Sequence, residues 1–210
     1  MKERPILFSA PMVRAILDGR KTQTRRIVKP GRDPYVGCQM APCEIAGDIN
    51  NGNFAIAPYG QPGDRLWVRE PFCPIYPQDP HYNGGQPIAY DYAATYQHGD
   101  RIGDYIGERK VWKRSIRMPR AASRITLEIT AVRVERLHDI SYEDALAEGV
   151  FDARPLLEIG QSPETSETPD EISRRRRWPQ REYAILWDTI NGPQSWDKNP
   201  LVWVLDFKRV

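Results

Sequence analysis

Residues Ile125–Val134 read Ile-Thr-Leu-Glu-Ile-Thr-Ala-Val-Arg-Val and form the clearest β-strand signal in the chain. Ile125, Leu127, Ile129 and Ala131 alternate with polar residues, which is the pattern of a strand with one face buried in a core. We therefore expect a long strand here, with the other elements of the fold assembled around it.

Shorter strands are expected on both sides of this segment in the sequence. Each is an apolar or alternating run, and Gly, Pro or Asp residues bound most of them, which is typical of strands. These runs are Ile6–Phe8, Thr22–Val28, Arg65–Glu70 and Leu201–Phe207. Two weaker runs, Ile88–Tyr90 and Val111–Trp112, are expected to pair with each other as edge strands.

Three helices are expected between the strands. Pro11 can open the first, and Gly19 can end it in the left-handed conformation. Ser141 can cap the second, with Asp144 in its first turn and Gly149 just past its end. The third carries a stripe with spacing i, i+3, i+4 and i+7, which predicts a core-facing side. This stripe consists of Tyr183, Leu186, Trp187 and Ile190.

Together these elements predict a single α+β domain over residues 1–210. Its few strands are expected to curl into a compact mixed β-barrel flanked by short helices. A chain of 210 residues supports one sizeable hydrophobic core. Three stretches without a clear hydrophobic period predict long loop insertions at about 29–62, 71–122 and 150–178.

The composition limits the classes of function. A net charge of +2 is too small to indicate a general nucleic-acid binder, so an electrostatic binding surface must be local. Three cysteines do not make a disulfide framework, which favours a cytoplasmic protein with ordinary thiols. A zinc site built from Cys38, Cys43, Cys73 and His81 is the alternative. No apolar run resembles a signal peptide or a membrane span, and we expect no cofactor and no obligatory protein partner.

The turn Gly19–Arg26 is the strongest candidate for chemistry, because it combines cations with two hydroxyl groups. The surrounding guanidinium groups would disfavour protonation of Lys21, and a neutral lysine can take a proton from the hydroxyl of Thr24. Side chains alternate along a strand, so the two residues meet only if the turn after Gly19 rotates Lys21 inward. The same cations could instead hold a phosphate backbone, or be a solvated loop.

Glu148 is the candidate carboxylate. It lies in the last turn of the helix capped by Ser141, where the negative end of the helix dipole disfavours an ionised carboxylate. Such a position suits a proton donor or a group that orients a lysine. A plain surface glutamate is the alternative.

Two further basic stretches are open to two interpretations each. The segment Arg114–Arg124 holds four arginines before the long strand, and guanidinium groups can bind phosphate through paired hydrogen bonds. Arg174–Arg177 is a run of four arginines. Each stretch is either a solvated surface or a contact for nucleic acid.

These motifs, in this order, resemble the ASCH superfamily of small PUA-like β-barrels, and in particular the longer ASCH proteins often found in phages and prophages. The resemblance covers roughly half of the chain. It rests on Ile6–Phe8 with its helix, Gly19-Arg20-Lys21-Thr22-x-Thr24-x-Arg26, Gly63-Asp64-x-Leu66-Trp67-Val68-Arg69-Glu70, Ile125–Val134, Ser141–Gly149 and Val202–Lys208. The three expected insertions are absent from the minimal members, so they would reshape the pocket rim or cover the site.

Small bacterial members of this family include amidohydrolases that remove the acyl group of N4-acetylcytidine. The resemblance implies Thr24 as nucleophile, Lys21 as the base that accepts its proton, and Glu148 as the proton donor to the departing amine. No metal is implied, and the substrate would be a modified nucleoside or RNA. The residues expected to contact it are Arg20, Thr22, Arg26, Trp67, Arg69, Glu70, Arg117 and Arg120. The alternatives are a non-catalytic RNA- or nucleotide-binding module and a ribonuclease that uses the same basic cleft.

Overall fold

A computed structural model of the chain describes residues 1–79, 81–95, 112–150 and 178–210. Most of the expected insertion at 150–178 lies outside the described residues. The arginine run Arg174–Arg177 and Val111 of the expected edge strand lie outside them as well.

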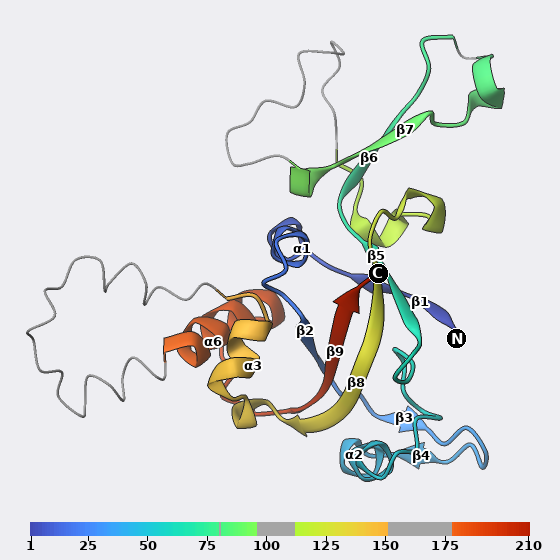
Figure 1. The fold of residues 1–210 in the computed structure, drawn as a ribbon. Helices are drawn as coiled ribbons and strands as arrows, with labels where there is room; N and C mark the ends of the chain where they lie inside the picture. The colour runs from blue at the N-terminus through green and yellow to red at the C-terminus, as the bar shows by residue number, and fades with distance from the viewer. Residues whose placement is uncertain (80, 96–111, 151–177) are drawn as a thin grey trace, which may run out of the picture.

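A five-stranded sheet forms the centre of the fold, in the order β1-β5-β8-β9-β2 (Figure 1). The pair β1 and β5 is parallel, and the other neighbours are antiparallel. The strands, in sheet order, are β1 (Glu3–Leu7), β5 (Arg65–Arg69), β8 (Thr126–Arg136), β9 (Leu201–Arg209) and β2 (Gln23–Ile27). All five lie at or next to segments for which the sequence predicts a strand.

The long strand β8 contains a bulge that changes which residues face the core. Leu127 and Ile129 are buried, but the register against β9 shifts between Ile129 and Ala131. An extra residue in one strand reverses the alternation beyond it. Val132 and Val134 are therefore buried, and the expectation that Ala131 continues the apolar face is wrong.

The sheet is open, so the expected closed barrel is wrong. A barrel would require backbone pairing between the edge strands β1 and β2, and these strands lie at opposite ends of the strand order. A side chain of β2 connects the two edges: Arg26 donates to the carbonyl oxygen of Leu7 at 2.9 Å, and its guanidinium lies 5.3 Å from the ring centroid of Phe8. The two edges are therefore connected by side-chain contacts and not by a ladder of backbone hydrogen bonds in the described part of the chain.

Within the described ranges, four helices and several short elements surround the sheet. The helices are α1 (Ala10–Leu17), α2 (Pro42–Asn50), α3 (Tyr142–Ala147) and α6 (Trp178–Asn191). The minor strands are β3 (Gly31–Arg32), β4 (Gln39–Met40), β6 (Phe72–Ile75) and β7 (Ala89–Tyr92). The 3-10 turns are η1 (Tyr82–Gly85), η2 (Ala93–Thr95), η3 (Ser115–Arg117), η4 (Arg120–Ala122) and η5 (Leu137–Asp139).

Helix α2 lies inside the expected irregular insertion at 29–62. Pro42 lies in its first turn, and the Glu44 side chain accepts a hydrogen bond from the backbone of Ala41 at 2.7 Å. Ile45 and Ile49, one turn apart, are buried in the main core. The expectation of an irregular loop is therefore wrong for this part of the insertion.

The insertion at 71–122 begins with a β-hairpin, β6 with β7, that extends away from the sheet (Figure 1). Strand β7 covers most of the expected strand Ile88–Tyr90. Its partner is β6, however, and not the segment around Trp112. The backbone of Lys113 then pairs with Phe72 in a single bridge, which holds the following segment against the hairpin.

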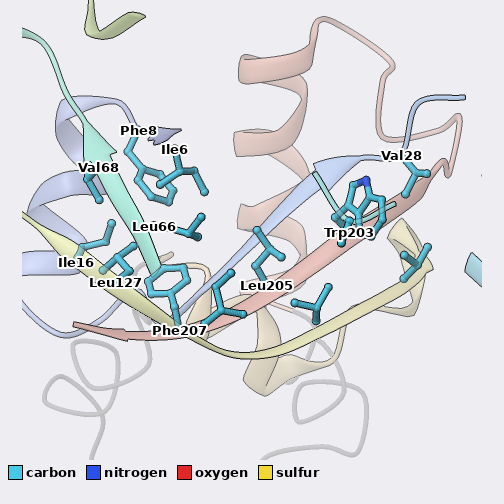
Figure 2. Packing of buried hydrophobic residues seen from close by; sticks show 14 of the residues in the cluster. Ile6, Phe8, Ile16, Val28, Leu66, Val68, Leu127, Trp203, Leu205 and Phe207 are labelled. Atoms are coloured by element: carbon cyan, nitrogen blue, oxygen red, sulfur yellow. The ribbon is translucent and has the colours of Figure 1, made fainter. Parts of the chain in front are cut away.

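Apolar side chains from β1, β5, β8 and β9 form the main core, and Val28, just past the end of β2, joins them. Figure 2 shows Leu66, Leu127 and Phe207 close together, one from each of the neighbouring strands β5, β8 and β9. Val202 and Val204 of β9 point to a second cluster under α3 and α6. Strand β9 is thus covered on both faces, and α3 and α6 lie together on one of them (Figure 1).

Only part of the apolar stripe expected on helix α6 faces the core. Tyr183 and Trp187 are buried in the second cluster, and Leu186 packs against it. Ile190, by contrast, is 52% exposed, so the expectation that it is core is wrong. It lies in the last turn of the helix, beyond the part that packs on the sheet.

Candidate functional site

A backbone junction brings the end of α3 against the start of β2. Gly19 ends α1 with φ of +74°, and Lys21 then forms an isolated antiparallel bridge with Glu148. The backbone N–H of Thr22 donates to the carbonyl oxygen of Ala147 at 2.8 Å. Two segments 127 residues apart are therefore held side by side by main-chain contacts.

Lys21 and Glu148 form a buried ion pair at this junction. The Lys21 Nζ donates to Glu148 Oε2 at 2.6 Å, and also to the carbonyl oxygens of Gln23 and Glu148, each at 2.8 Å. The exposed fractions of the two side chains are 0% and 2%. Three acceptors match the three N–H groups of an ammonium, so this geometry belongs to the charged pair.

The pKa of Lys21 lies below the ordinary lysine value of 10.5, and burial is the largest cause. The charge and hydrogen bond of Glu148 act in the opposite direction. Arg26 and Arg25 add only smaller lowering effects. The direction is the one expected from the sequence, but its main cause is loss of water and not the neighbouring guanidinium groups.

The second carboxylate oxygen of Glu148 faces Arg25 and Tyr183. Glu148 Oε1 accepts from Arg25 Nη1 at 3.4 Å and from the Tyr183 hydroxyl at 3.3 Å. Burial, followed by the charge of Glu148, raises the pKa of Tyr183 well above its usual value of 10. Tyr183 therefore stays a neutral phenol that donates to the carboxylate. Neither partner was among the expected site residues.

Arg25 anchors a polar network beneath the pair. Its guanidinium donates to Glu135 at 2.7 Å and to Asp144 at 2.9 Å, and it also bonds to the side-chain oxygen of Gln23. Gln23 in turn donates to Asp144 at 2.8 Å and to Asp206 at 2.5 Å. These contacts lock the side chains on one face of β2, where Lys21, Gln23 and Arg25 share the same parity.

Thr24 has the opposite parity and lies at the core. It is fully buried, and its Oγ1 has no hydrogen-bond partner among the described residues. The three bonds of Lys21 go to Gln23 and Glu148, so the structure joins Lys21 to Glu148 but not to the Thr24 hydroxyl. Lys21 Nζ nevertheless contacts the carbonyl of the peptide bond that connects Gln23 to Thr24.

A pocket of about 690 Å³ lies between the two edge strands of the sheet. Leu7 and Phe8 at the end of β1, and Arg25 and Arg26 of β2, contribute to its wall. The rest of the lining includes Glu148, Tyr183, Trp187 and Ile190. Neither Lys21 nor Thr24 is among the described lining residues. The open edge of the sheet, where a barrel would close, is thus the mouth of the site.

Two buried donors in this pocket wall lack partners. The indole Nε1 of Trp187 and the Nε of Arg25 make no hydrogen bond with the described residues. Buried donors are nearly always paired, and an unpaired one costs free energy. Both atoms have almost no exposed surface, so an acceptor on a ligand would reach them only after neighbouring side chains move.

Three of the expected substrate contacts, Arg20, Thr22 and Arg26, differ in their position relative to the pocket. Arg26 lines the pocket. Arg20 is exposed, and it pairs with Asp18 at 2.9 Å and donates to the carbonyl oxygen of Gly149 at 3.3 Å. Thr22 is also exposed, beside the junction. Only Arg26 of these three has direct access to the pocket.

The remaining expected contacts lie outside this pocket. The half-buried Trp67 ring lies 4.7 Å from the guanidinium carbon of Arg69 and 6.0 Å from that of Arg120. Glu70 is buried in a paired contact with Arg124, at 2.9 and 3.0 Å. Arg117 lines a different hollow, beside the hairpin. The structure therefore joins Lys21 to Glu148, with Arg20 and Thr22 beside this junction and Arg26 in the adjoining pocket wall. It places the other expected contacts, Trp67, Arg69, Glu70, Arg117 and Arg120, elsewhere.

No group of three or more His, Cys, Asp or Glu side chains in the described part of the chain is arranged to hold a metal ion. Cys38 and Cys43 are exposed, and Cys73 is half-buried. None of the helices in the described ranges is both long and apolar enough to cross a membrane.

Comparison with protein-family models, with curated proteins and with solved structures found no match to this chain.

Proposed function

We propose that this chain is a PUA-like ASCH protein that acts as an amidohydrolase. Its substrate would be an N-acylated nucleobase or nucleoside of the N4-acetylcytidine kind. The observation that carries the proposal is the buried Lys21–Glu148 pair, 2.6 Å apart, with Glu148 in the pocket wall and Lys21 hydrogen-bonded at the peptide bond before Thr24. A buried pair of titratable groups beside a pocket is typical of an active site.

The chemistry would proceed in two stages. Lys21 first passes a proton to Glu148, which leaves a neutral amine. Thr24 Oγ then attacks the acyl carbonyl while its proton moves to Lys21. As the C–N bond breaks, Glu148 protonates the departing amine. Water attacks the acyl-threonine ester in the second stage, the ester bond breaks, and a carboxylic acid leaves.

The low dielectric of the site supports the first proton transfer. Burial disfavours charge on Lys21, and a neutral amine beside a neutral carboxylic acid avoids two buried charges. The hydrogen bond of 2.6 Å gives the proton a short path. Arg26, in the pocket wall, would stabilise the oxyanion that forms on the attacked carbonyl.

The proposal includes an opening step, because Thr24 is buried behind the pocket wall. Phe8 lines the pocket, and its ring centroid lies 5.8 Å from Lys21 Nζ. Rotation of this ring on substrate binding would open a path from the pocket to the lysine. Catalytic hydrogen bonds often form only in the complex with substrate.

The pocket suits a heterocyclic base. A volume of about 690 Å³ lies within the usual range of small-molecule sites. The rings of Tyr183 and Trp187 contribute to its wall, and movement of neighbouring side chains would expose the unpaired N–H groups of Trp187 and Arg25 as donors. A pyrimidine with ring nitrogen and carbonyl acceptors would match both features.

The direct test is turnover of N4-acetylcytidine by the purified protein, followed by chromatographic detection of cytidine. We expect activity in the wild type and a loss of at least about 100-fold in Lys21→Met, Glu148→Gln and Thr24→Val, because each removes one proposed reacting group. Thr130→Val, at an exposed position of β8, is the matched control and should retain full activity. Absence of turnover in the wild type, or full turnover in Thr24→Val, would overturn the proposal.

A non-catalytic nucleotide-binding module is the second candidate. The observation in its favour is that the Thr24 hydroxyl neither contacts Lys21 nor reaches the pocket. Isothermal titration calorimetry with N4-acetylcytidine separates the two functions. Binding without release of cytidine would support the module, and release of cytidine would support the enzyme.

A further inference from the structure

A second hollow of about 720 Å³ lies beside the β6–β7 hairpin, outside the site described above. Its described wall comes from the hairpin and from the segment 112–119. We name it the hairpin groove. Its described lining consists of Phe72, Pro74, Tyr76, Gln86, Pro87, Tyr90, Trp112, Lys113, Arg114, Ile116, Arg117 and Pro119.

Positive charge is concentrated in the hairpin groove. Lys113, Arg114 and Arg117 are all exposed, and no carboxylate in the described part of the chain pairs with their side chains. None of the described lining residues is acidic. The whole chain carries a net charge of only +2, so three cations in one groove, without a carboxylate partner among the described residues, are a local anion-binding feature.

Aromatic side chains line the same groove. Tyr76 is 54% exposed, and Tyr90 and Trp112 are half-buried. Phe72 supports Tyr90 from below, with ring centroids 6.2 Å apart. A surface that alternates cations with accessible rings is the combination that single-stranded nucleic acids require, because cations contact phosphates and rings stack on bases.

The hairpin groove adjoins the pocket at the edge of the sheet. Pro71 lines the pocket and the next residue, Phe72, lines the groove. Ser115 likewise lines the pocket, while Arg114 and Ile116 on either side of it line the groove. Two short segments thus form a shared wall, and a chain-like ligand could occupy both hollows at once.

We propose that the hairpin groove binds a single-stranded polynucleotide through its phosphates and bases. A second step rests on the proposed function. If the pocket takes the acylated base, the hairpin groove holds the neighbouring nucleotides of the same strand. The substrate would then be a modified base within a strand, and not a free nucleoside. Arg114 and Arg117 contact phosphates, and Tyr76 stacks on a base.

An acidic peptide is the competing ligand for three cations. It would use Lys113, Arg114 and Arg117 but would have no need of exposed aromatic rings beside them. The groove also adjoins a pocket with aromatic rings in its wall, which suit a base. A polynucleotide matches both features, and we therefore favour it.

The test is fluorescence anisotropy with labelled single-stranded oligonucleotides of about 12 nucleotides, in ribose and deoxyribose forms, free of acylated bases. We expect wild-type binding to weaken with salt. The double variant Arg114→Gln/Arg117→Gln should lower the slope of log K against log salt by about 1.4, because each contact with a single-strand phosphate contributes about 0.7. Tyr76→Ala should weaken binding by about 10-fold, through loss of one stacked base.

Matched control variants remove the same kinds of side chain at exposed positions away from the groove. Arg32→Gln/Lys198→Gln removes two cations, and Tyr35→Ala removes an exposed ring. Arg32 and Tyr35 belong to the β3–β4 region, at the opposite end of the sheet from the hairpin (Figure 1). Both controls should bind the oligonucleotides as the wild type does.

Three results would overturn the proposal: no oligonucleotide binding by the wild type, equal loss in the control variants, or tighter binding of a labelled poly-glutamate peptide than of either oligonucleotide. Unequal binding of the two oligonucleotides would identify the sugar, with the groove assignment retained.

A second measurement distinguishes failure of this proposal from failure of the proposed function. N4-acetylcytidine placed within an oligonucleotide should be deacylated with a lower KM than the free nucleoside. Binding without any turnover would reject the hydrolase and retain the groove. Turnover of free nucleoside and strand with equal KM would reject the groove and retain the hydrolase.

Discussion

At the scale of single residues, the Thr24 hydroxyl has opposite effects on the stability of the fold and on the proposed chemistry. Its hydroxyl is buried without a partner among the described residues. An unsatisfied buried hydroxyl costs about 1–3 kcal/mol, so the fold gains nothing from it. A nucleophile, in contrast, requires a hydroxyl that is free to react.

Replacement of Thr24 by valine removes this hydroxyl and keeps the shape of the side chain. We expect Thr24→Val to raise the free energy of unfolding by about 1 kcal/mol and to abolish turnover. Urea unfolding and the cytidine-release assay measure the two effects. Thr130→Val should change neither. A loss of stability in Thr24→Val would show that the hydroxyl has a stabilising partner, contrary to the structure.

Lys21 is a residue where charge and burial oppose each other. In Lys21→Met, the carboxylate of Glu148 loses the ammonium at 2.6 Å and stays buried. We expect a loss of about 3–5 kcal/mol in the free energy of unfolding at pH 7. The exposed Arg20–Asp18 pair is the control, because Arg20→Met should cost no more than about 1 kcal/mol. Similar losses in both variants would contradict the buried pair.

The lowered pKa of Lys21 also predicts a dependence on pH. Between that pKa and 10.5, the unfolded chain binds the Lys21 proton more often than the folded chain does. Stability from this group therefore rises with pH across this range and is fully present only above 10.5. The wild type should gain stability relative to Lys21→Met as the pH is raised from 7 toward 10.5, as measured by urea unfolding. A constant difference would contradict the shift.

At the scale of elements, the junction between α1, α3 and β2 depends on close packing at Gly149. This residue has φ of +87°, and a Cβ there would lie 3.0 Å from the Cβ of Lys21 and 3.1 Å from that of Ala15. The end of α3 can approach Lys21 closely only because Gly149 has no side chain. The position of the Glu148 carboxylate follows from this contact.

Gly149→Ala should therefore disturb the site as well as the backbone. We expect a larger loss of stability than for Gly19→Ala, whose φ of +74° costs about 1–2 kcal/mol but whose added Cβ meets no atom within 4 Å. We also expect lower turnover in Gly149→Ala, because Lys21 and Glu148 must separate. Thermal unfolding and the activity assay provide the comparison. Equal effects in the two variants would indicate backbone strain alone.

The elements that the sequence predicted correctly have a clear local period. Strands β1, β2, β5, β8 and β9 and helices α1, α3 and α6 all lie at or next to their expected segments. The bulge in β8 and the helix α2 were missed. Ile45 and Ile49 provide only two apolar positions in α2, which is too short a signal beside the surrounding Gly, Pro and Asn residues.

At the scale of the whole molecule, the described part of the first insertion belongs to the main core. Ile45 of α2 packs in the same cluster as Leu66 and Trp203 of the central sheet. The chain should consequently unfold as one unit. We expect Ile45→Ala to lower the stability of the entire protein by about 2–5 kcal/mol, and Val36→Ala, at an exposed position, to have an effect below about 0.5 kcal/mol.

Tryptophan fluorescence and far-ultraviolet circular dichroism, recorded together during urea unfolding, test whether the chain unfolds as one unit. Coincident transitions that shift together in Ile45→Ala would support a single domain. Two separate transitions, with only one displaced by the substitution, would mean that the insertion folds independently of the sheet.

The candidate site shows how many of its residues can be predicted from the local sequence. Lys21, Thr24 and Glu148 were chosen from local composition and from the family resemblance, and the structure places two of them in contact. Arg25 and Tyr183, which hold the other carboxylate oxygen, were missed. Arg25 appeared only as one more cation in a basic turn, and Tyr183 as part of a core stripe. Nothing in their neighbours indicated a shared partner.

The sequence by itself determined the α+β class, most of the strands and helices, and the basic turn after α1, because backbone periodicity and turn residues act over a few neighbouring positions. Only the tertiary structure decided that the sheet stays open and that a pocket occupies its edge. It also decided the Lys21–Glu148 contact, which joins residues 127 positions apart. Such contacts depend on how bulky side chains pack between strands, and this packing is a property of the whole chain.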